Sequence, residues 1–417
     1  MHQPRTLIFG LNYPPETTGI SPYTGAMAEG LARRGHQVRA VVAHPHYPEW
    51  KITSGYGQWS RNERINGVDV QRLRHYVPRQ PSLIRRALSE VTLGVRQAIV
   101  RWGKPNVIVA VSPGLIASLI VRLRAKMTHR ETPFIVWVQD LYSVGLSETS
   151  QGAGAPARVI HALEAWLLRS ASSVVVIHER FANRLQEDFG VSPHRITVVR
   201  NWNHLPPFPV ADVAAVRASF GWNEGEIVVV HAGNMGVKQG LHHVVDAGRL
   251  AFERGEPVRF VLVGNGSQRE EIRQRVNDAQ TTTQILPPLD DEAFAQVLQS
   301  ADVLLVNELP GVAEMAVPSK LTSYFASGRP VLAATDVGGI TAQVIRDAGA
   351  GLAVAAGDAA AILDGAKALA ADREGSTRLG ESGKRYKETM LNETRAIDRF
   401  DSLLADLIAK DAESPSA

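Results

Sequence analysis

The sequence of 417 residues contains no cysteine, and its apolar runs are short. Without cysteine, the chain has no disulfide bond, thiolate zinc site or cysteine nucleophile. Its nearest approach to a membrane-spanning run, residues 107–121, is interrupted by Pro113 and Gly114. The apolar run at residues 7–11 is too short for a signal peptide. We therefore expect a chain that does not cross a membrane, and its composition is compatible with a reducing cytoplasm.

Acidic residues are scarce in residues 81–130, where nine basic residues accompany a single acid, Glu90. Aromatic residues do not interleave with these charges as in nucleic-acid-binding modules, so we expect no nucleic-acid partner. The segment is either a solvated helix face or a surface for an anionic partner, such as a membrane or a phosphorylated substrate. Peripheral membrane helices combine cations such as Arg85, Arg86 and Arg96 with apolar neighbours. The apolar neighbours here are Leu83, Ile84, Leu88, Val91 and Leu93.

Short apolar runs alternate with helical stretches along the chain, and hydrophobic residues make up 44% of it. The runs are continuous rather than alternating, as expected for strands of parallel sheets buried on both faces. The sequence therefore predicts an α/β protein. In the first half we expect strands at 7–10, 37–43, 68–74, 107–111, 134–138, 173–177 and 196–199. In the second half we expect them at 227–231, 259–264, 284–286, 303–306, 330–334 and 352–354.

A proline-rich stretch, residues 201–213, separates the two series of strands and is the best candidate for a linker. The chain length also favours two domains. We expect doubly wound, Rossmann-like domains at residues 1–203 and 204–390, facing a cleft at the carboxyl ends of their sheets. Residues 391–417 should form a helix that packs back on the N-terminal domain, followed by a disordered tail.

The loop after the first expected strand places the small residues Thr17, Thr18 and Gly19 before a helix. A ligand can approach the backbone closely at such a point, although a loop of this kind can also merely join a strand to a helix. The helix should bury Tyr23 and its i+4 partners and end at a glycine. The loop lacks the G-x-G-x-x-G pattern, which is evidence against a nicotinamide dehydrogenase.

The second glycine-containing loop, residues 232–240, contains Gly233, Gly236 and Gly240 around Lys238. Glycines can free backbone N–H groups to bind an anion, and the lysine adds a positive charge, so we expect a phosphate site here. The next loop contains Gly264 and Gly266, a weaker signal because such turns are common.

In the segment 308–331, Pro318 and Ser319 can begin a helix. Ser319 and Lys320 would then lie at its positive end, a suitable place for a diphosphate. Glu314, just upstream, can accept hydrogen bonds from a polyhydroxylated ligand. The alternative is an ordinary helix cap with a surface lysine. The buried side of this helix should consist of Leu321, Tyr324 and Phe325, and Gly328 should end it.

Three stretches together carry a family resemblance: LNYPPETTGISPYTGAMAEGLARRGHQV, GNMGVKQGL and PSKLTSYFASGRPVLA, with HPHYPEW and VQDLYS in support. Over nearly its full length the chain resembles retaining glycosyltransferases of family 4, which have the GT-B fold. Within that family it is similar to the colanic-acid and exopolysaccharide branch. The resemblance implies that the C-terminal domain binds a nucleotide-diphosphate sugar and the N-terminal domain binds the acceptor.

The resemblance also implies roles for individual residues. The donor-binding residues would be Thr18, Gly19, Gly233, Asn234, Gly236, Gly264, Gly266, Glu314, Pro318, Ser319, Lys320 and Leu321. The catalytic candidates are Lys238, Lys320 and Asp140, and the acceptor-side candidates are His44, His46, Glu49 and Gln139. The chain departs from the family pattern at Asn234, where many members have arginine, at Ser323, where many have a glutamate, and at Gln139, where a histidine is frequent.

In the expected mechanism, lysines and a helix N-terminus stabilise the departing diphosphate. We expect no metal site, since the sequence has no D-x-D pair, and no cofactor besides the donor substrate. The expected partners are a nucleotide sugar, a saccharide or polyprenyl-diphosphate-linked acceptor, and an anionic membrane surface on the inner face of the cell membrane. Two alternatives stay open: a nucleotide-sugar epimerase of the same fold, and a non-catalytic nucleotide-sugar-binding component of a polysaccharide assembly.

Overall fold

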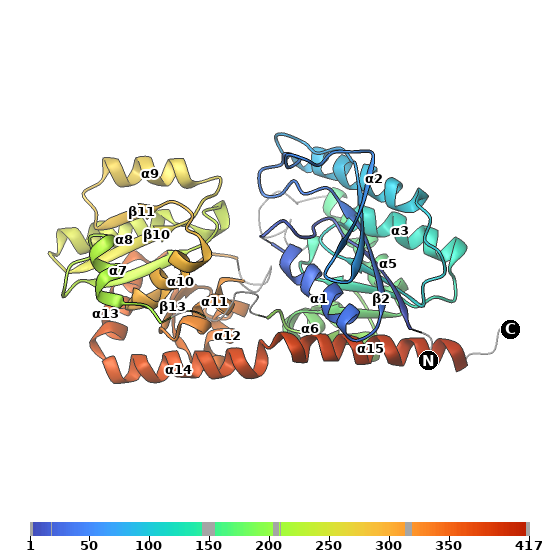
Figure 1. Ribbon diagram of the computed structural model, residues 1–417. Coiled ribbons are helices and arrows are strands. Elements are labelled where there is room, and N and C mark those ends of the chain that lie inside the picture. Colours follow the sequence, from blue (N-terminus) through green and yellow to red (C-terminus); the bar gives the residue numbers. More distant parts are fainter. Residues whose placement is uncertain are drawn as a thin grey trace. The chain divides into compact units, whose positions relative to one another are not determined.

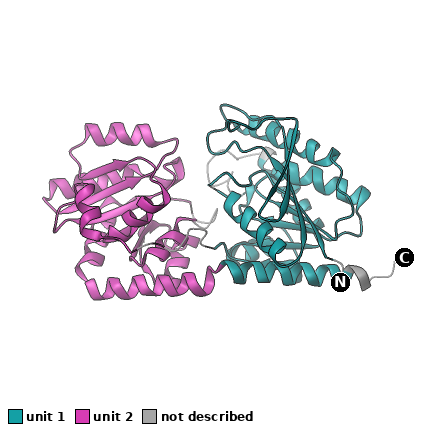
Figure 2. Cartoon of the chain, in the orientation of Figure 1, with its two compact units in different colours: residues 1–204, 393–417 teal, residues 205–392 magenta. Residues whose placement is uncertain are grey.

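The computed structural model describes residues 3–17, 19–143, 155–202, 208, 210–312 and 319–413. The chain forms two compact units, residues 1–204 together with 393–417, and residues 205–392 (Figure 2). Each unit is built around one mainly parallel sheet with helices packed on it (Figure 1). The first unit is discontinuous in sequence because the last helix returns to it.

Unit 1 contains an eight-stranded sheet in the order β3-β4-β2-β1-β5-β6-β7-β8. Its strands are β1 (Arg5–Phe9), β2 (Gln37–Ala43), β3 (Ser60–Ile65), β4 (Val68–Leu73), β5 (Val107–Val111), β6 (Phe134–Val138), β7 (Ser173–Val176) and β8 (Ile196–Val198). Its helices are α1 (Ser21–Arg33), α2 (Leu83–Ile99), α3 (Leu115–Thr128), α5 (Ala155–Ser170), α6 (Glu179–Glu187) and α15 (Glu393–Glu413), with a short 3-10 turn at Pro193–Arg195.

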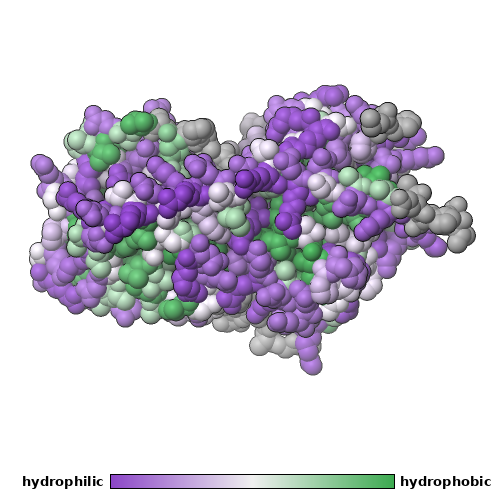
Figure 3. Space-filling view, turned by 90° about the horizontal axis from the view of Figure 1, so that it is seen from below, coloured by the Kyte–Doolittle hydropathy of each residue, from purple (hydrophilic) through white to green (hydrophobic). Residues whose placement is uncertain are grey.

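Helix α1 forms where its apolar spacing predicts it, because Tyr23, Met27 and Leu31 all face the core. It ends just before Gly35, whose φ of +93° lies in the region that favours glycine. Helix α15 packs against α1 through Ile397, Phe400 and Leu404, all of which are buried. Its other side is polar, and hydrophilic residues cover most of the face shown in Figure 3.

One strand of unit 1 was missed by the sequence analysis. β3 runs antiparallel to β4, so the sheet is not wholly parallel. β3 is an edge strand with a polar sequence, SRNERI, and it lacks the apolar run on which the prediction of strands depended. The hairpin turn is Asn66-Gly67, and both residues have positive φ. Because Asn-Gly is a common two-residue hairpin turn, this dipeptide was the available signal.

Unit 2 contains a six-stranded, wholly parallel sheet in the order β11-β10-β9-β12-β13-β14. Its strands are β9 (Ile227–Ala232), β10 (Val258–Val263), β11 (Thr283–Leu286), β12 (Val303–Asn307), β13 (Val331–Thr335) and β14 (Gly351–Ala355). Its helices are α7 (Val213–Ser219), α8 (His242–Glu253), α9 (Arg269–Asp278), α10 (Asp291–Ser300), α11 (Lys320–Ser327), α12 (Ile340–Ala348), α13 (Ala359–Ala371) and α14 (Arg373–Met390), with a 3-10 turn, η2, at Val237–Gln239.

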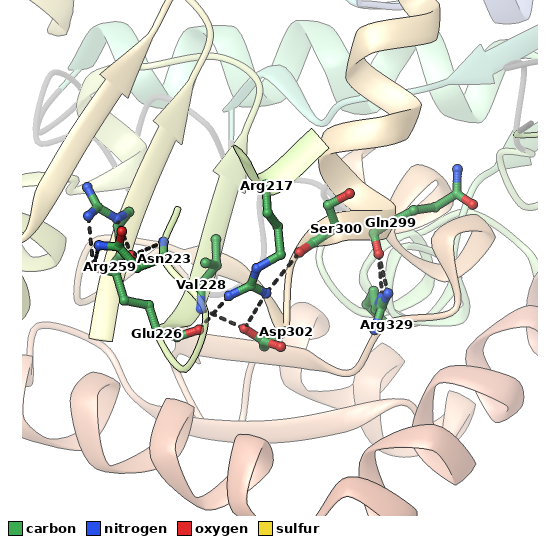
Figure 4. A network of polar contacts seen from close by, with 9 residues as sticks. All are labelled: Arg217, Asn223, Glu226, Val228, Arg259, Gln299, Ser300, Asp302 and Arg329. Carbon is green, nitrogen blue, oxygen red and sulfur yellow. Dashed lines mark hydrogen bonds and ion pairs between the residues drawn. The ribbon is translucent and has the colours of Figure 1, made fainter. Parts of the chain in front are cut away.

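A polar network lies at the amino end of the unit 2 sheet (Figure 4). Arg217 on α7 forms an ion pair with Asp302 at 3.0 Å, and Asp302 also accepts the backbone N–H of Val228 at 2.8 Å. Beside them, Arg259 forms an ion pair with Glu226. These contacts join the starts of β9, β10 and β12. They therefore stabilise the amino ends of these strands, whereas ligands bind at the carboxyl ends in such folds.

Candidate functional site

The carboxyl ends of β9 and β10 in unit 2 bring the two predicted glycine-containing loops together. β9 and β12 are neighbours in the sheet. The strands that follow β9 are added on one side of this pair, and those that follow β12 are added on the other. Open α/β sheets bind ligands at such a switch point. The backbone N–H of Met235 donates to the carbonyl of Asn265 at 2.8 Å, which joins the first loop to the second. The start of α11 contributes Lys320 to the same place.

Two of the glycines are required by close backbone approach. A Cβ on Gly264 would lie 2.0 Å from the carbonyl oxygen of Gly233, and one on Gly266 would lie 2.5 Å from that of Met235. Both glycines also have positive φ, at +137° and +156°. Any other residue at either position would push the two loops apart.

The expectation that these glycines free their N–H groups for an anion is wrong for the first loop. The N–H of Gly233 donates to the Val263 carbonyl at 2.9 Å, and that of Gly240 to the Val237 carbonyl at 3.1 Å. The N–H of Gly236 donates to Oε1 of Gln239 at 3.0 Å. These three N–H groups hold the loop in shape and are not available to an anion, whereas the side chains of Lys238 and Lys320 can supply positive charge.

Lys320 places such a charge over the first loop. Its Cε and Nζ atoms lie 3.7 and 3.9 Å from where a Cβ of Gly233 would stand. Its Nζ lies 3.0 Å from Nε2 of His231, the residue before the last of β9. One turn further along α11, the Tyr324 hydroxyl accepts the N–H of Ala232 at 2.8 Å and donates to the Leu305 carbonyl at 3.2 Å. Tyr324 thus ties the helix that carries Lys320 to β9 and β12.

The surroundings of Lys320 shift its protonation. Burial lowers the pKa of the amine to about 7, and the nearby Glu308 carboxylate opposes this shift. Glu308 itself accepts hydrogen bonds from the hydroxyls of Thr335 and Thr341. The alternative of a plain cap with a surface lysine is therefore wrong: Lys320 is half-buried and, within the described residues, Ser319 makes no side-chain cap.

Lys238 lies in the 3-10 turn η2, on a loop that is held by hydrogen bonds to Asn307 and Leu309. Its carbonyl accepts the N–H of Leu309 at 2.8 Å. The side-chain amide of Asn307 donates to the carbonyls of Gln239 and Gly240, at 2.7 and 3.1 Å. Lys238 is half-buried and therefore part of a well-anchored turn.

The remaining donor-side candidates divide into three groups. Asn234 is exposed, with its side chain beside Gly236 and Gly266. Leu321 is buried with Phe325 in the core, as predicted for that helix face, and Gly328 ends the helix with a φ of +73°. Thr18, Glu314 and Pro318 lie outside the described residues.

In unit 1 the loop after β1 is held by a buried carboxylate that the sequence analysis did not single out. Oε1 of Glu16 accepts the backbone N–H groups of His46 and Tyr47 at 2.7 and 2.8 Å, and Oε2 accepts the side-chain amide of Asn12 at 2.9 Å. Glu16 thereby joins the loops that follow β1 and β2. Gly19, with a φ of +65°, packs beside the Tyr47 ring.

The acceptor-side candidates are mostly structural in their contacts. His44 and His46 are buried, with ring nitrogens bonded to the carbonyls of Gln58 and His44 at 2.9 Å each. Burial lowers the pKa of His44. Gln139 is also buried and accepts the Asn201 amide at 2.9 Å. The fourth acceptor-side candidate, Glu49, is exposed, and the catalytic candidate Asp140, two residues after β6, is half-buried.

Known proteins resemble the chain in both units. Residues 18–202 match the family described as glycosyl transferase 4-like domain, and residues 226–372 match glycosyl transferases group 1. The chain is 32% identical over 339 residues to the colanic acid biosynthesis glycosyl transferase WcaI of Escherichia coli K12, covering 78% of this chain and 81% of WcaI. It is 31% identical to the D-inositol 3-phosphate glycosyltransferase of Nocardia farcinica, over 52% of this chain and 49% of that protein.

Solved structures share the fold. Sucrose-phosphate synthase from Thermosynechococcus elongatus superposes with a TM-score of 0.72 at 18% identity, over 98% of this chain and 100% of that one. Anabaena HepE in complex with UDP superposes with a TM-score of 0.70 at 13% identity, over 96% and 99%. The expected GT-B fold and the family resemblance are both confirmed. The chain is a transferase that belongs to the GT4-like, group 1 glycosyltransferases.

Proposed function

We propose that the chain transfers a sugar, with retention of configuration, from a nucleotide-diphosphate donor to a saccharide or lipid-linked acceptor. The observation that supports this most is the half-buried Lys320 held over the loop of Gly233, at the switch point of the unit 2 sheet. A cation at the carboxyl end of this sheet can bind the diphosphate of a donor. Unit 2 is accordingly the proposed donor domain, and unit 1 the acceptor domain.

The proposed chemistry is electrostatic. As the glycosidic bond to the diphosphate breaks, negative charge grows on the departing oxygen, and a fixed cation nearby stabilises that charge. Lys320 supplies a cation of defined position, and Lys238 supplies a second charge from an anchored turn. With the N–H groups of Gly233, Gly236 and Gly240 already bonded, the two lysines carry most of this role.

Retention places the acceptor hydroxyl on the face of the sugar from which the diphosphate departs. In that arrangement a diphosphate oxygen can accept the hydroxyl proton as the new bond forms. His44 and His46, whose rings are buried and bonded to backbone carbonyls, are poor candidates for a separate general base. Asp140 stays a catalytic candidate, and Glu49 stays a candidate on the acceptor side.

The names of similar proteins guide the choice of substrates. HepE was solved with UDP and with UDP-glucose, and WcaI is named for colanic acid biosynthesis. UDP-sugars are therefore the first donors to supply, and a polyprenyl-diphosphate-linked saccharide is the first acceptor. Proton NMR of the product tests the proposal: the anomeric coupling of the donor should be kept. Inversion would contradict retention, and donor interconversion without an acceptor would instead identify an epimerase.

We also propose that unit 1 lies on an anionic membrane surface through α2. Ile84, Leu88, Val91, Val95 and Ile99 are all exposed, and their spacing places them on one side of that helix. Two neighbouring helices add exposed apolar residues, because α3 packs on α2 and α5 packs on α3. Those residues are Leu123, Met127, Val159 and Leu163. Among the described residues, no helix is long and apolar enough to cross a membrane.

Not all of the nine basic residues in 81–130 are available to a membrane surface, although the sequence alone does not distinguish them. Arg96 is buried and lies over the Trp59 ring at 3.5 Å, while Arg122 and Arg124 donate to backbone carbonyls. These three are structural. Leu93 is also buried and belongs to the core rather than to the exposed stripe. The exposed cations that remain are Arg85, Arg86, Arg101, Lys104, Lys126 and Arg130.

A further inference from the structure

His231 is a polar residue in β9, a central strand of the unit 2 sheet whose residues after Ile227 are all buried. It follows three valines in β9, and its side chain is fully buried. A buried imidazole is costly unless both ring nitrogens find partners. Both do: Nδ1 lies 3.1 Å from the carbonyl oxygen of Leu305 on β12, and Nε2 lies 3.0 Å from Nζ of Lys320.

The contact of Nδ1 with the Leu305 carbonyl favours one tautomer. A carbonyl oxygen only accepts hydrogen bonds, so Nδ1 carries the proton. In the neutral ring Nε2 is then an acceptor, and the Lys320 amine donates to it. Burial and the adjacent amine lower the pKa of His231, and they outweigh the hydrogen bonds to the backbone of Leu305 and Asn234, which raise it, so the ring is neutral. The ring is therefore a fixed acceptor for Lys320.

We propose that His231 is a positioning residue for the donor diphosphate and acts through Lys320. This inference rests on the proposed function. A lysine has a long, flexible side chain, and ordering it on binding costs conformational entropy. The hydrogen bond to His231 orders the Lys320 side chain already in the free protein, so less entropy is lost on binding. Two N–H groups of the ammonium are then left for phosphate oxygens. Glu308, which accepts hydrogen bonds from two threonines, is a charged group near this amine and favours its protonated form.

Two variants separate the hydrogen bond from the volume of the ring. His231→Gln keeps a donor for Leu305 and an acceptor for Lys320, whereas His231→Leu fills the space without either. Calorimetric titration with UDP, GDP and ADP, each paired with its nucleoside, measures the part of the affinity that depends on the diphosphate. We expect His231→Leu to lower about tenfold the affinity for the nucleotide diphosphate that the parent binds and to leave the affinity for its nucleoside unchanged. His231→Gln should keep most of the parent's affinity for the diphosphate.

The outcomes are distinct. If the parent binds a diphosphate and His231→Leu binds it equally well, the inference is wrong while the proposed function stands. If the parent binds none of the three diphosphates, the proposed function fails and the inference falls with it. If His231→Leu does not fold, ¹⁵N NMR of the parent decides the matter, with His231→Gln identifying the signal. A neutral Nδ1–H ring at neutral pH is expected, and a charged ring or the Nε2–H tautomer would overturn the inference.

Discussion

The amine of Lys320 lies 3.0 Å from Nε2 of His231, and its pKa is lowered to about 7 because it is buried. An anionic diphosphate favours the charged amine. Below this pKa the amine is already protonated, whereas above it a proton must be taken up on binding. Affinity for a nucleotide diphosphate should therefore fall as pH rises above about 7, towards about tenfold per pH unit.

Calorimetry in buffers of different ionisation enthalpy measures this proton uptake directly. At about pH 8, above the range in which the nucleotide's own terminal phosphate titrates, uptake should approach one proton in the parent. Lys320→Met should bind more weakly and take up none. Equal uptake by parent and variant would assign the proton to another group.

A second buried group predicts a pH effect on stability. Glu90 on α2 accepts the N–H of Ile116 at 2.8 Å, which satisfies the start of α3, and burial raises its pKa to about 7. The native protein therefore binds more protons than the unfolded chain between the ordinary pKa of a glutamate and about 7. Stability should fall as pH rises through that window and stay low above it.

Glu90→Gln removes the charge and keeps an acceptor for Ile116. At about pH 8 we expect the free energy of unfolding in urea to increase by about 3 kcal/mol, and near pH 4 we expect little change. Glu90→Ala is the control, because it loses both charge and acceptor and should be destabilised at low pH. A glutamine variant less stable than the parent at about pH 8 would show that the carboxylate is needed in charged form.

The apolar stripe of α2 predicts attachment to anionic vesicles. Replacing Arg85 and Arg86 by glutamate should lower co-sedimentation at low salt by more than about tenfold, since each cation near such a surface contributes about 1 kcal/mol. Ile84→Ser with Leu88→Ser should weaken attachment without changing its salt dependence.

The matched control for attachment is the exchange of two arginines of unit 2, the exposed Arg249 and the half-buried Arg273, for glutamate. This control lowers the net charge by the same amount, so it should pellet like the parent. If it loses attachment as the Arg85 and Arg86 variant does, net charge rather than α2 is responsible. No pelleting of the parent at low salt would contradict the membrane proposal outright.

Much of the fold was predictable because the strands buried on both faces are written as continuous apolar runs, such as VIVAV in β5 and VLLVN in β12. β3 was missed because a solvent-facing edge strand needs no such run. Helix α11 was predicted with its buried face and its terminal glycine, since these features are local in sequence.

The site was predictable in its location but not in its contacts. The glycines of the two loops are visible in the sequence, yet their reason is the approach of Gly264 to Gly233, which only the folded sheet creates. The sequence gives no sign that His231, in an apolar strand, has a special role, because its partner Lys320 is 89 residues away. The sequence predicts Arg96 as a surface cation, because nothing in it indicates the position of this side chain over Trp59.

We propose that the carboxyl end of the unit 2 sheet, with Lys238 and Lys320, binds the diphosphate of a nucleotide sugar. The most direct measurement is the melting temperature of the full chain with UDP, GDP and ADP, each compared with its nucleoside, in the parent and in Lys238→Ala and Lys320→Ala. Arg273→Ala serves as the control. We expect one diphosphate to stabilise the parent well beyond its nucleoside, by about 2.7 kcal/mol at a hundredfold excess over Kd. Each lysine variant should bind that diphosphate about 10–100-fold more weakly, because a charge-assisted contact is worth about 1.5–3 kcal/mol. Stabilisation by none of the diphosphates, or equal stabilisation of the parent and both lysine variants, would contradict it.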